Sequence, residues 1–142
     1  MRWSRLQKLI YGIWVDDLQL QIHASAYPLS GSASVVRYWI TMGKEIIWDV
    51  PHDFPEERAK GTYNTVASEI SEVIKEYLDT PRETLLSRIF ERDKWGVIDM
   101  FRVVDRRFGR KSLEQLSRAS LSMPARKLLE ARLKALDDRT VI

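Results

Sequence analysis

Residues 37–54 read RYWITMGKEIIWDVPHDF, and this stretch decides the fold of the chain. Residues 35–42 and 45–50 are both rich in β-branched and aromatic side chains, which favour strands. Gly43 and Lys44 lie between them, and a glycine at the first position of a two-residue turn is typical of β-hairpins. The stretch therefore predicts an antiparallel hairpin.

A two-residue turn also predicts the register of this hairpin. The expected pairs are Met42 with Glu45, Ile40 with Ile47 and Trp39 with Trp48. One face would then carry Val35, Trp39, Ile46, Trp48 and Val50, and the other Tyr38, Ile40, Met42 and Ile47. This assignment depends on the turn length, because a slip of one residue moves every side chain to the opposite face.

The residues before the hairpin add a helix and a third strand. Apolar side chains recur at helical spacing over residues 3–14, which predicts an amphipathic helix. Over residues 18–26 apolar and polar side chains alternate, which predicts a strand with one solvated face. The linker 28–33 is rich in proline, glycine and serine and is expected to be a turn or loop.

The residues after the hairpin are predicted to be helical. An apolar stripe marks a first helix at 63–77, and Thr80 to Glu83 read as a capping box that opens a second. Asp93 is expected to cap a third helix that ends before Gly109, with Ser112 capping a fourth. A last helix is predicted over 123–136. The expected class is α+β, with a three-stranded antiparallel meander after an N-terminal helix, packed with four or five C-terminal helices.

Length and composition favour one globular domain over residues 1–142. A division into 1–60, with the helix and meander, and 61–142, with the helices, is the alternative. The sequence contains no cysteine, which excludes disulfides and thiolate chemistry and suits a reducing compartment. No apolar stretch reaches the 18 residues or so of a membrane span, so we expect a cytoplasmic protein that does not bind a membrane.

Catalysis is the weakest interpretation of the sequence. His52 and Asp53, with Asp49 before them, could serve a hydrolase or a metal enzyme as base or ligands. Proline and aspartate are also common in the turn that follows a strand, for backbone reasons alone. No phosphate-binding loop, dinucleotide fingerprint or nucleophile elbow is present. The sequence therefore predicts no catalytic residue, no metal and no cofactor.

Nucleic-acid binding is the first alternative, because the basic excess is concentrated near the C-terminus. Residues 94–134 contain eleven basic and four acidic side chains, although the whole chain carries a net charge of only +3. Within residues 101–119, two expected helices meet at a glycine, as in DNA-binding helical pairs. The candidate phosphate contacts there are Arg102, Arg106, Arg107, Arg110 and Lys111. The competing interpretation is a solvated helical face.

Protein binding is the interpretation that the sequence favours most. The hairpin is apolar on both faces and the first strand is polar on one, so one sheet face would place polar and apolar residues side by side. Such mixtures are typical of interface centres, unless helices cover both faces. The candidate partner-binding residues are Gln21, His23, Tyr38, Ile40 and Ile47. The sequence does not determine the oligomeric state.

The runs WITMGKEIIWDVP (39–51) and DKWGVIDMFRVVDRRFG (93–109) resemble a family of small conserved bacterial proteins of unknown function. The resemblance implies a bacterial, cytoplasmic protein and transfers no functional residue. By analogy with other small bacterial α+β proteins, it suggests a protein that neutralises or regulates a protein partner.

Overall fold

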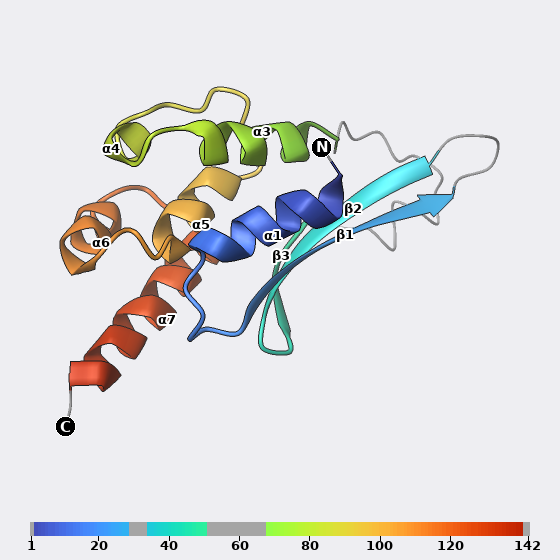
Figure 1. Ribbon diagram of the computed structural model, residues 1–142. Coiled ribbons are helices and arrows are strands. Elements are labelled where there is room, and N and C mark those ends of the chain that lie inside the picture. Colours follow the sequence, from blue (N-terminus) through green and yellow to red (C-terminus); the bar gives the residue numbers. More distant parts are fainter. Residues whose placement is uncertain (1, 29–33, 51–67, 141–142) are drawn as a thin grey trace.

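The computed structural model describes residues 2–28, 34–50 and 68–140. Helix α1 (Trp3–Ile13) precedes three strands, β1 (Leu20–Pro28), β2 (Ser34–Met42) and β3 (Glu45–Val50). The described helices that follow are α3 (Ser68–Asp79), α4 (Arg82–Leu85), α5 (Val97–Val104), α6 (Arg110–Ser117) and α7 (Met123–Thr140). The predicted α+β class and the order of its parts are confirmed (Figure 1).

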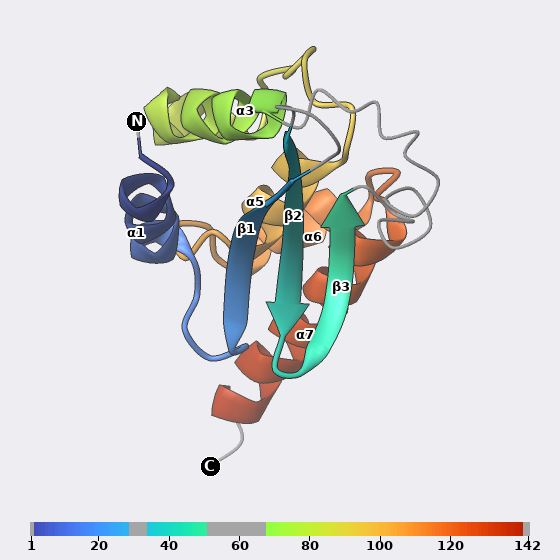
Figure 2. The same ribbon diagram turned by 90° about the vertical axis from the view of Figure 1, so that its right-hand side faces the viewer.

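The three strands form one antiparallel sheet in the order β1-β2-β3. In Figure 2, α5, α6 and α7 lie behind this sheet, and α1 lies beside β1. Among the described helices, none lies in front of the sheet in this view. The sheet therefore has an inner face toward the helices and an outer face, and the outer face is free of described helices.

The hairpin register differs from the prediction after its first pair. The observed partners are Met42 with Glu45, Thr41 with Ile46, Ile40 with Trp48 and Trp39 with Asp49. The first of these confirms the turn, in which Gly43 has a φ of 63°, a conformation that favours glycine. The predicted pairs of Ile40 with Ile47 and of Trp39 with Trp48 are wrong. The cause is a β-bulge at Ile47, which shifts the rest of β3 by one residue.

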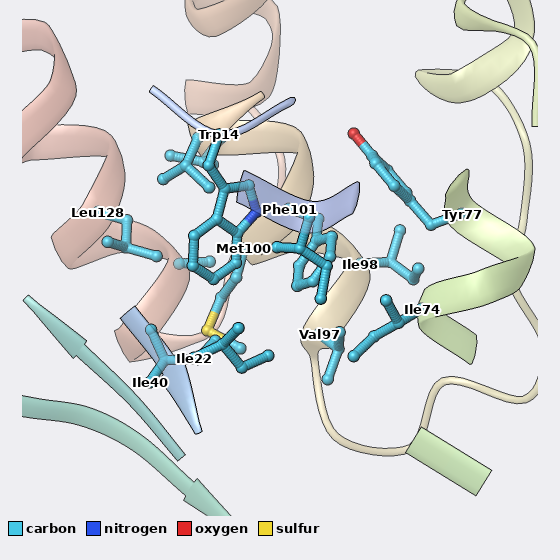
Figure 3. Close-up of a cluster of buried hydrophobic side chains, with 14 of the residues drawn as sticks. Trp14, Ile22, Ile40, Ile74, Tyr77, Val97, Ile98, Met100, Phe101 and Leu128 are labelled. Atoms are coloured by element: carbon cyan, nitrogen blue, oxygen red, sulfur yellow. The ribbon is translucent and has the colours of Figure 1, made fainter. Parts of the chain in front are cut away.

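The inner face of the sheet packs on α5, which lies at the centre of the core. Six of the eight residues of α5 are buried, as expected for a helix enclosed on all sides. Ile22 and Ile40 from the sheet meet Met100 of α5 and Leu128 of α7 (Figure 3). The Trp48 indole also donates a hydrogen bond to the Trp95 carbonyl at 3.0 Å. Strand β3 is thereby tied to the segment that precedes α5.

Helix α1 protects the free edge of β1. The hydroxyl of Tyr11 accepts a hydrogen bond from the Ile22 amide at 3.0 Å, and Gln7 donates to the Ile22 carbonyl at 2.7 Å. An unpaired strand edge is a template for unwanted pairing with another chain. These two side chains satisfy the outward backbone groups of Ile22 and so block pairing at this point.

The third predicted helix ends earlier than expected, because Asp105 leaves the helix to pair with α1. Helix α5 stops at Val104, and Asp105 forms an isolated antiparallel bridge with Trp14. The Val15 amide donates to the Val104 carbonyl at 2.9 Å, and the Arg106 amide donates to the Ile13 carbonyl at 2.7 Å. These contacts join the end of α1 and the residues after it to the turn between α5 and α6.

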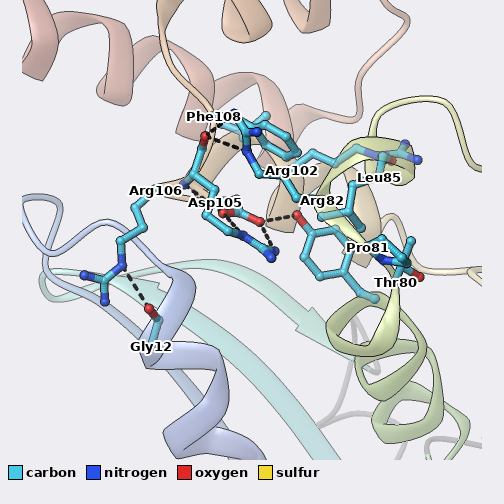
Figure 4. A network of polar contacts seen from close by, with 12 residues as sticks. Gly12, Thr80, Pro81, Arg82, Leu85, Arg102, Asp105, Arg106 and Phe108 are labelled. Carbon is cyan, nitrogen blue, oxygen red and sulfur yellow. Dashed lines mark hydrogen bonds and ion pairs between the residues drawn. The ribbon is translucent and has the colours of Figure 1, made fainter.

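Around this turn lies a buried polar network, here called the α5–α6 junction, made of Tyr77, Asp105, Arg107 and Arg132. The fully buried Asp105 carboxylate accepts hydrogen bonds from the Tyr77 hydroxyl at 2.7 Å and from Arg107 at 2.9 and 2.6 Å. Figure 4 shows Asp105 at the centre of this network. Burial raises the pKa of Tyr77, so its hydroxyl stays protonated and continues to donate.

Arg132 completes the junction from α7. Its guanidinium donates to the carbonyls of Val103 and Asp105, both at 2.8 Å, and to that of Phe108. These carbonyls lie at the end of α5 and in the turn, where a helix leaves acceptors without intrahelical partners. Burial lowers the pKa of Arg132, and the charges of Asp105, Asp17 and Tyr77 oppose this effect. The α5–α6 junction therefore serves to stabilise the fold.

Two expected helix caps are absent. The Thr80 hydroxyl donates back to the Glu76 carbonyl of α3 at 2.7 Å and accepts from Arg88, so it does not cap α4. Helix α6 begins at Arg110, which places Ser112 inside its first turn. By contrast, the Asp93 carboxylate accepts from the amides of Trp95, Val97 and Ile98 and holds the start of α5, close to its predicted role.

Candidate functional site

The outer face of the sheet is the main candidate site. Strand alternation and the β-bulge together place eight described side chains on it: Gln21, His23, Ser25, Arg37, Trp39, Thr41, Ile46 and Asp49. Gln21 and Ile46 are exposed, and the others are half-buried. This set is called the outer face below.

Trp39 lies at the middle of the outer face, and its ring contacts two neighbouring side chains. The His23 ring stacks on it with the ring centroids 4.9 Å apart and the planes 18° from parallel. The Arg37 guanidinium lies 4.6 Å from the centroid of the same indole, which is cation–π geometry. These contacts come from two neighbouring strands and fix the orientation of the indole.

Arg37 is itself held by β3. Its Nε and Nη2 donate to the two carboxylate oxygens of Asp49 at 2.9 and 2.7 Å, a bidentate arrangement. The side chains of Arg37 and Asp49 are 17% and 16% exposed, so water screens the pair only partly. The planar guanidinium therefore lies in a defined position beside Trp39.

His23 is the titratable group of the outer face nearest to neutral pH. Its Nε2 lies 3.3 Å from the Thr41 hydroxyl, which can donate or accept according to the tautomer of the ring. Burial lowers the pKa of His23 below its ordinary value of 6.5. The ring is therefore neutral at pH 7, which suits its stacking on Trp39.

The structure separates the five residues predicted to bind a partner. Gln21 and His23 lie on the outer face as expected. Tyr38 and Ile40 are 5% and 1% exposed and face the core, so their predicted place at the surface is wrong. The Tyr38 hydroxyl is hydrogen-bonded to that of Ser71 in α3, at 2.6 Å. Ile47 is half-buried and packs against the core at the β-bulge.

The prediction missed Arg37, Trp39 and Asp49. The assumption that Trp39 faces Trp48 placed both indoles on one side of the sheet, and the bulge puts them on opposite sides. A possible signal was the charge pattern, because the opposite charges of Arg37, two residues before Trp39, and Asp49, one residue after Trp48, flank the expected tryptophan pair. Opposite charges on adjacent strands often pair across the sheet.

Four of the five predicted phosphate-binding residues are engaged within the chain. Arg102 donates to the Leu85 carbonyl at 3.0 Å, Arg106 to the Gly12 carbonyl at 2.9 Å, and Arg107 to Asp105. Arg110 forms an ion pair with Asp137 at 2.7 Å. Lys111 is exposed on α6. The basic segment therefore includes arginines that hold the fold together, which reduces the charge available for phosphates.

The residues considered for catalysis do not form a described site. His52 and Asp53 lie outside the described residues, and Asp49 is bound to Arg37. Within residues 2–28, 34–50 and 68–140, no group of three or more acidic, histidine or cysteine side chains could hold a metal ion. Over the same parts of the chain, no helix is both long and apolar enough to span a membrane.

Comparison with known proteins gives a family for the chain. No curated protein and no solved structure matches it significantly. Residues 56–133, more than half of the 142 residues, match a family of unknown function. The matching segment includes α3 to α6 and most of α7, and the three strands lie before it. The chain belongs to the SF0329 protein family.

Proposed function

We propose that this chain is a non-catalytic binding protein whose outer face binds another protein. The observation that carries the proposal is the Trp39 indole, which contacts His23 and Arg37 on a face that no described helix covers. Tryptophan and arginine are the residue types that most often dominate the energy of protein interfaces.

The side chains of the outer face are ordered before any partner binds. Arg37 donates two hydrogen bonds to Asp49 and lies over the Trp39 ring. The His23 ring stacks on the same indole. Ordering a flexible side chain on binding costs about 0.5–1.5 kcal/mol. A face that is already ordered avoids much of this cost, which supports a role in binding.

The same contacts favour recognition over chemistry. The Asp49 carboxylate is bound by Arg37, and His23 has the Thr41 hydroxyl and the Trp39 ring as neighbours. A general base is expected within hydrogen-bond reach of the group that it deprotonates, with a third group to orient it. The contacts of His23 hold its ring flat against that of Trp39. The exposed side chain of Ile46 adds apolar area to the same face.

The proposed partner is a protein that this chain regulates or neutralises in the bacterial cytoplasm. The lack of cysteine supports a reducing compartment. The mixture of Trp39, Ile46, Gln21 and the Arg37–Asp49 pair supports a partner surface that is partly apolar and partly polar.

A capture experiment with matched variants tests the proposal. Wild-type chain, Trp39→Ala and Ile89→Ala would be immobilised in equal amounts and exposed to a lysate of the source organism. Ile89 is the control because its side chain is 82% exposed and lies outside the sheet. We expect one protein to be retained by wild type and Ile89→Ala and lost with Trp39→Ala. Equal retention by all three would show that the outer face is not the interface.

The same experiment separates protein binding from nucleic-acid binding. Nuclease treatment of the lysate should leave the captured protein unchanged. If capture instead disappears with nuclease, weakens steeply with salt and depends on Arg110 and Lys111, the basic helices are the binding site and the proposal is wrong.

A further inference from the structure

A second candidate site lies at the opposite end of α1 from the chain's N-terminus. A cavity of about 350 Å³ is enclosed by the segment after α1, the turn between α5 and α6, and α7. Small-molecule sites usually have volumes of about 300–1,000 Å³. The lining residues are Trp14, Val15, Asp16, Asp17, Arg106, Phe108, Gly109, Arg132 and Leu136.

One wall of the cavity is basic. Arg106 is anchored through its Nε, which donates to the Gly12 carbonyl at 2.9 Å, as Figure 4 shows. Its two terminal nitrogens have no hydrogen-bond partner among the described residues, so they can donate to a ligand. Arg132 is 5% exposed and donates to carbonyl oxygens, with no ion pair to a described carboxylate. Its charge adds a fixed positive potential to this wall.

The lining also contains two acidic residues and an apolar part. Asp16 and Asp17 follow α1 and are exposed, and Asp17 lies close enough to Arg132 to raise its pKa. Trp14 and Phe108 are buried, and with Val15 and Leu136 they contribute the apolar part of the lining. The cavity therefore combines two cationic groups, two anionic groups and an apolar surface.

We propose that this cavity binds a small zwitterion of the free α-amino-acid class. The carboxylate would accept hydrogen bonds from the terminal nitrogens of Arg106, and the ammonium would face Asp16. An apolar side chain would pack on Trp14 and Phe108. A simple anion would meet the repulsion of Asp16, and a simple cation that of the two arginines. A zwitterion complements both charges.

Isothermal titration of the purified chain with free L-amino acids tests the proposal. Propionate and propylamine serve as half-ligands that carry one charge each. We expect saturable binding of at least one amino acid with an apolar side chain, and binding of each half-ligand weaker by roughly tenfold or more, since tenfold corresponds to about 1.4 kcal/mol. Equal binding of propionate would make the cavity an anion site, and no binding of any amino acid would overturn the proposal.

Two glycines offer a matched pair of variants. Gly109 lines the cavity with φ at −101°, and a Cβ added there meets no atom within 4 Å, so Gly109→Leu adds bulk without backbone strain. Gly12 also has open space around an added Cβ but does not line the cavity, so Gly12→Ala is the control. We expect Gly109→Leu to abolish binding and Gly12→Ala to preserve it. Unchanged binding to Gly109→Leu would contradict the proposed site.

Two charge variants locate the ligand's ends. Arg106→Gln should weaken binding of the amino acid and of propionate alike. Asp16→Asn should weaken binding of the amino acid and, because it removes a repulsive charge, strengthen binding of propionate. If Asp16→Asn has no effect on the amino acid, the ammonium does not face Asp16 and the zwitterion assignment is wrong. Both residues are exposed, so these variants are expected to fold.

Discussion

Two arginine–aspartate pairs in this chain have nearly the same geometry and differ in the burial of the aspartate. Arg107 binds Asp105 through two hydrogen bonds of 2.9 and 2.6 Å, and Arg37 binds Asp49 through two of 2.9 and 2.7 Å. The Asp105 side chain is completely buried, whereas that of Asp49 is 16% exposed on the outer face. Geometry alone therefore does not distinguish a structural pair from a binding surface.

The difference lies in what else each pair contacts. Asp105 also accepts from Tyr77 and from the Arg107 amide, so its carboxylate is saturated by groups of the chain itself. The hydrogen bond to Asp105 raises the pKa of Arg107, which keeps this arginine charged. Arg37 instead supports the half-buried ring of Trp39 on the outer face. The first pair stabilises a turn, and the second orders a surface.

The largest effect is expected for Asp105→Ala. This change leaves the charge of Arg107 and the Tyr77 hydroxyl without their acceptor, and breaking a buried pair from one side costs about 3–5 kcal/mol. Urea denaturation should show this loss in the free energy of unfolding. A loss below about 1 kcal/mol, the range of exposed pairs, would mean that the two pairs are energetically alike and would remove the basis of the comparison.

Arg132→Leu should give the next largest effect. The substitution removes the donor to three carbonyls around the end of α5, and unsatisfied buried groups cost about 1–3 kcal/mol each. The substitution also removes the cost of burying the guanidinium charge, so we expect a net decrease of about 2–4 kcal/mol in the free energy of unfolding. Lys134→Leu, an exposed position two residues further along α7, is the control and should change little.

Asp49→Ala should affect stability least among the three ionic variants. A partly exposed pair contributes about 1 kcal/mol or less to the free energy of unfolding. The variant should nevertheless reduce partner capture, because Arg37 loses its anchor and Trp39 loses an ordered neighbour. A double-mutant cycle with Arg37→Ala measures the pair directly. If the coupling energy of Arg37 and Asp49 were as large as that measured in the same way for Arg107 and Asp105, the pair on the outer face would serve mainly to stabilise the fold.

The smallest effect is expected for the pH dependence of stability, which on the outer face arises from the titration of His23. The pKa of His23 is lowered in the folded chain, so its contribution to stability is complete above the unfolded value of about 6.5 and is lost as the pH falls through the lower folded value. Wild type should therefore lose stability relative to His23→Gln as the pH falls below about 6.5. An NMR titration of the ring that gave an ordinary pKa would contradict this expectation.

The sequence predicted the elements of the sheet and misplaced half of one strand. The alternating residues 18–26 and the glycine turn identified three strands and the pair of Met42 with Glu45. Alternation has a period of two, so the extra residue at Ile47 reversed every assignment beyond it. The prediction thus grouped Trp39 with Trp48 and Val50, which face the core, so the Trp39 side of β2 was assigned to the core and Tyr38 and Ile40 to the surface.

The arginines show why local patterns did not reveal their role. Residues 101–119 carry a basic cluster that resembles a phosphate-binding surface, and Arg106 and Arg107 belong to it. Their partners include Gly12, which is 94 residues away in sequence, and Asp105, whose burial follows from its bridge to Trp14. Contacts over such sequence distances are set by the tertiary fold, and no local period in the sequence reports them.

Site-specific photo-crosslinking tests the central claim most directly. A benzophenone amino acid would replace the exposed Gln21 on the outer face or, as the control, the exposed Lys75 on α3. We expect a discrete adduct with one other protein from position 21, lost when Trp39 is changed to alanine, and none from position 75. An adduct from position 75 alone, or one from position 21 that persists in Trp39→Ala, would contradict the assignment of the outer face as the interface.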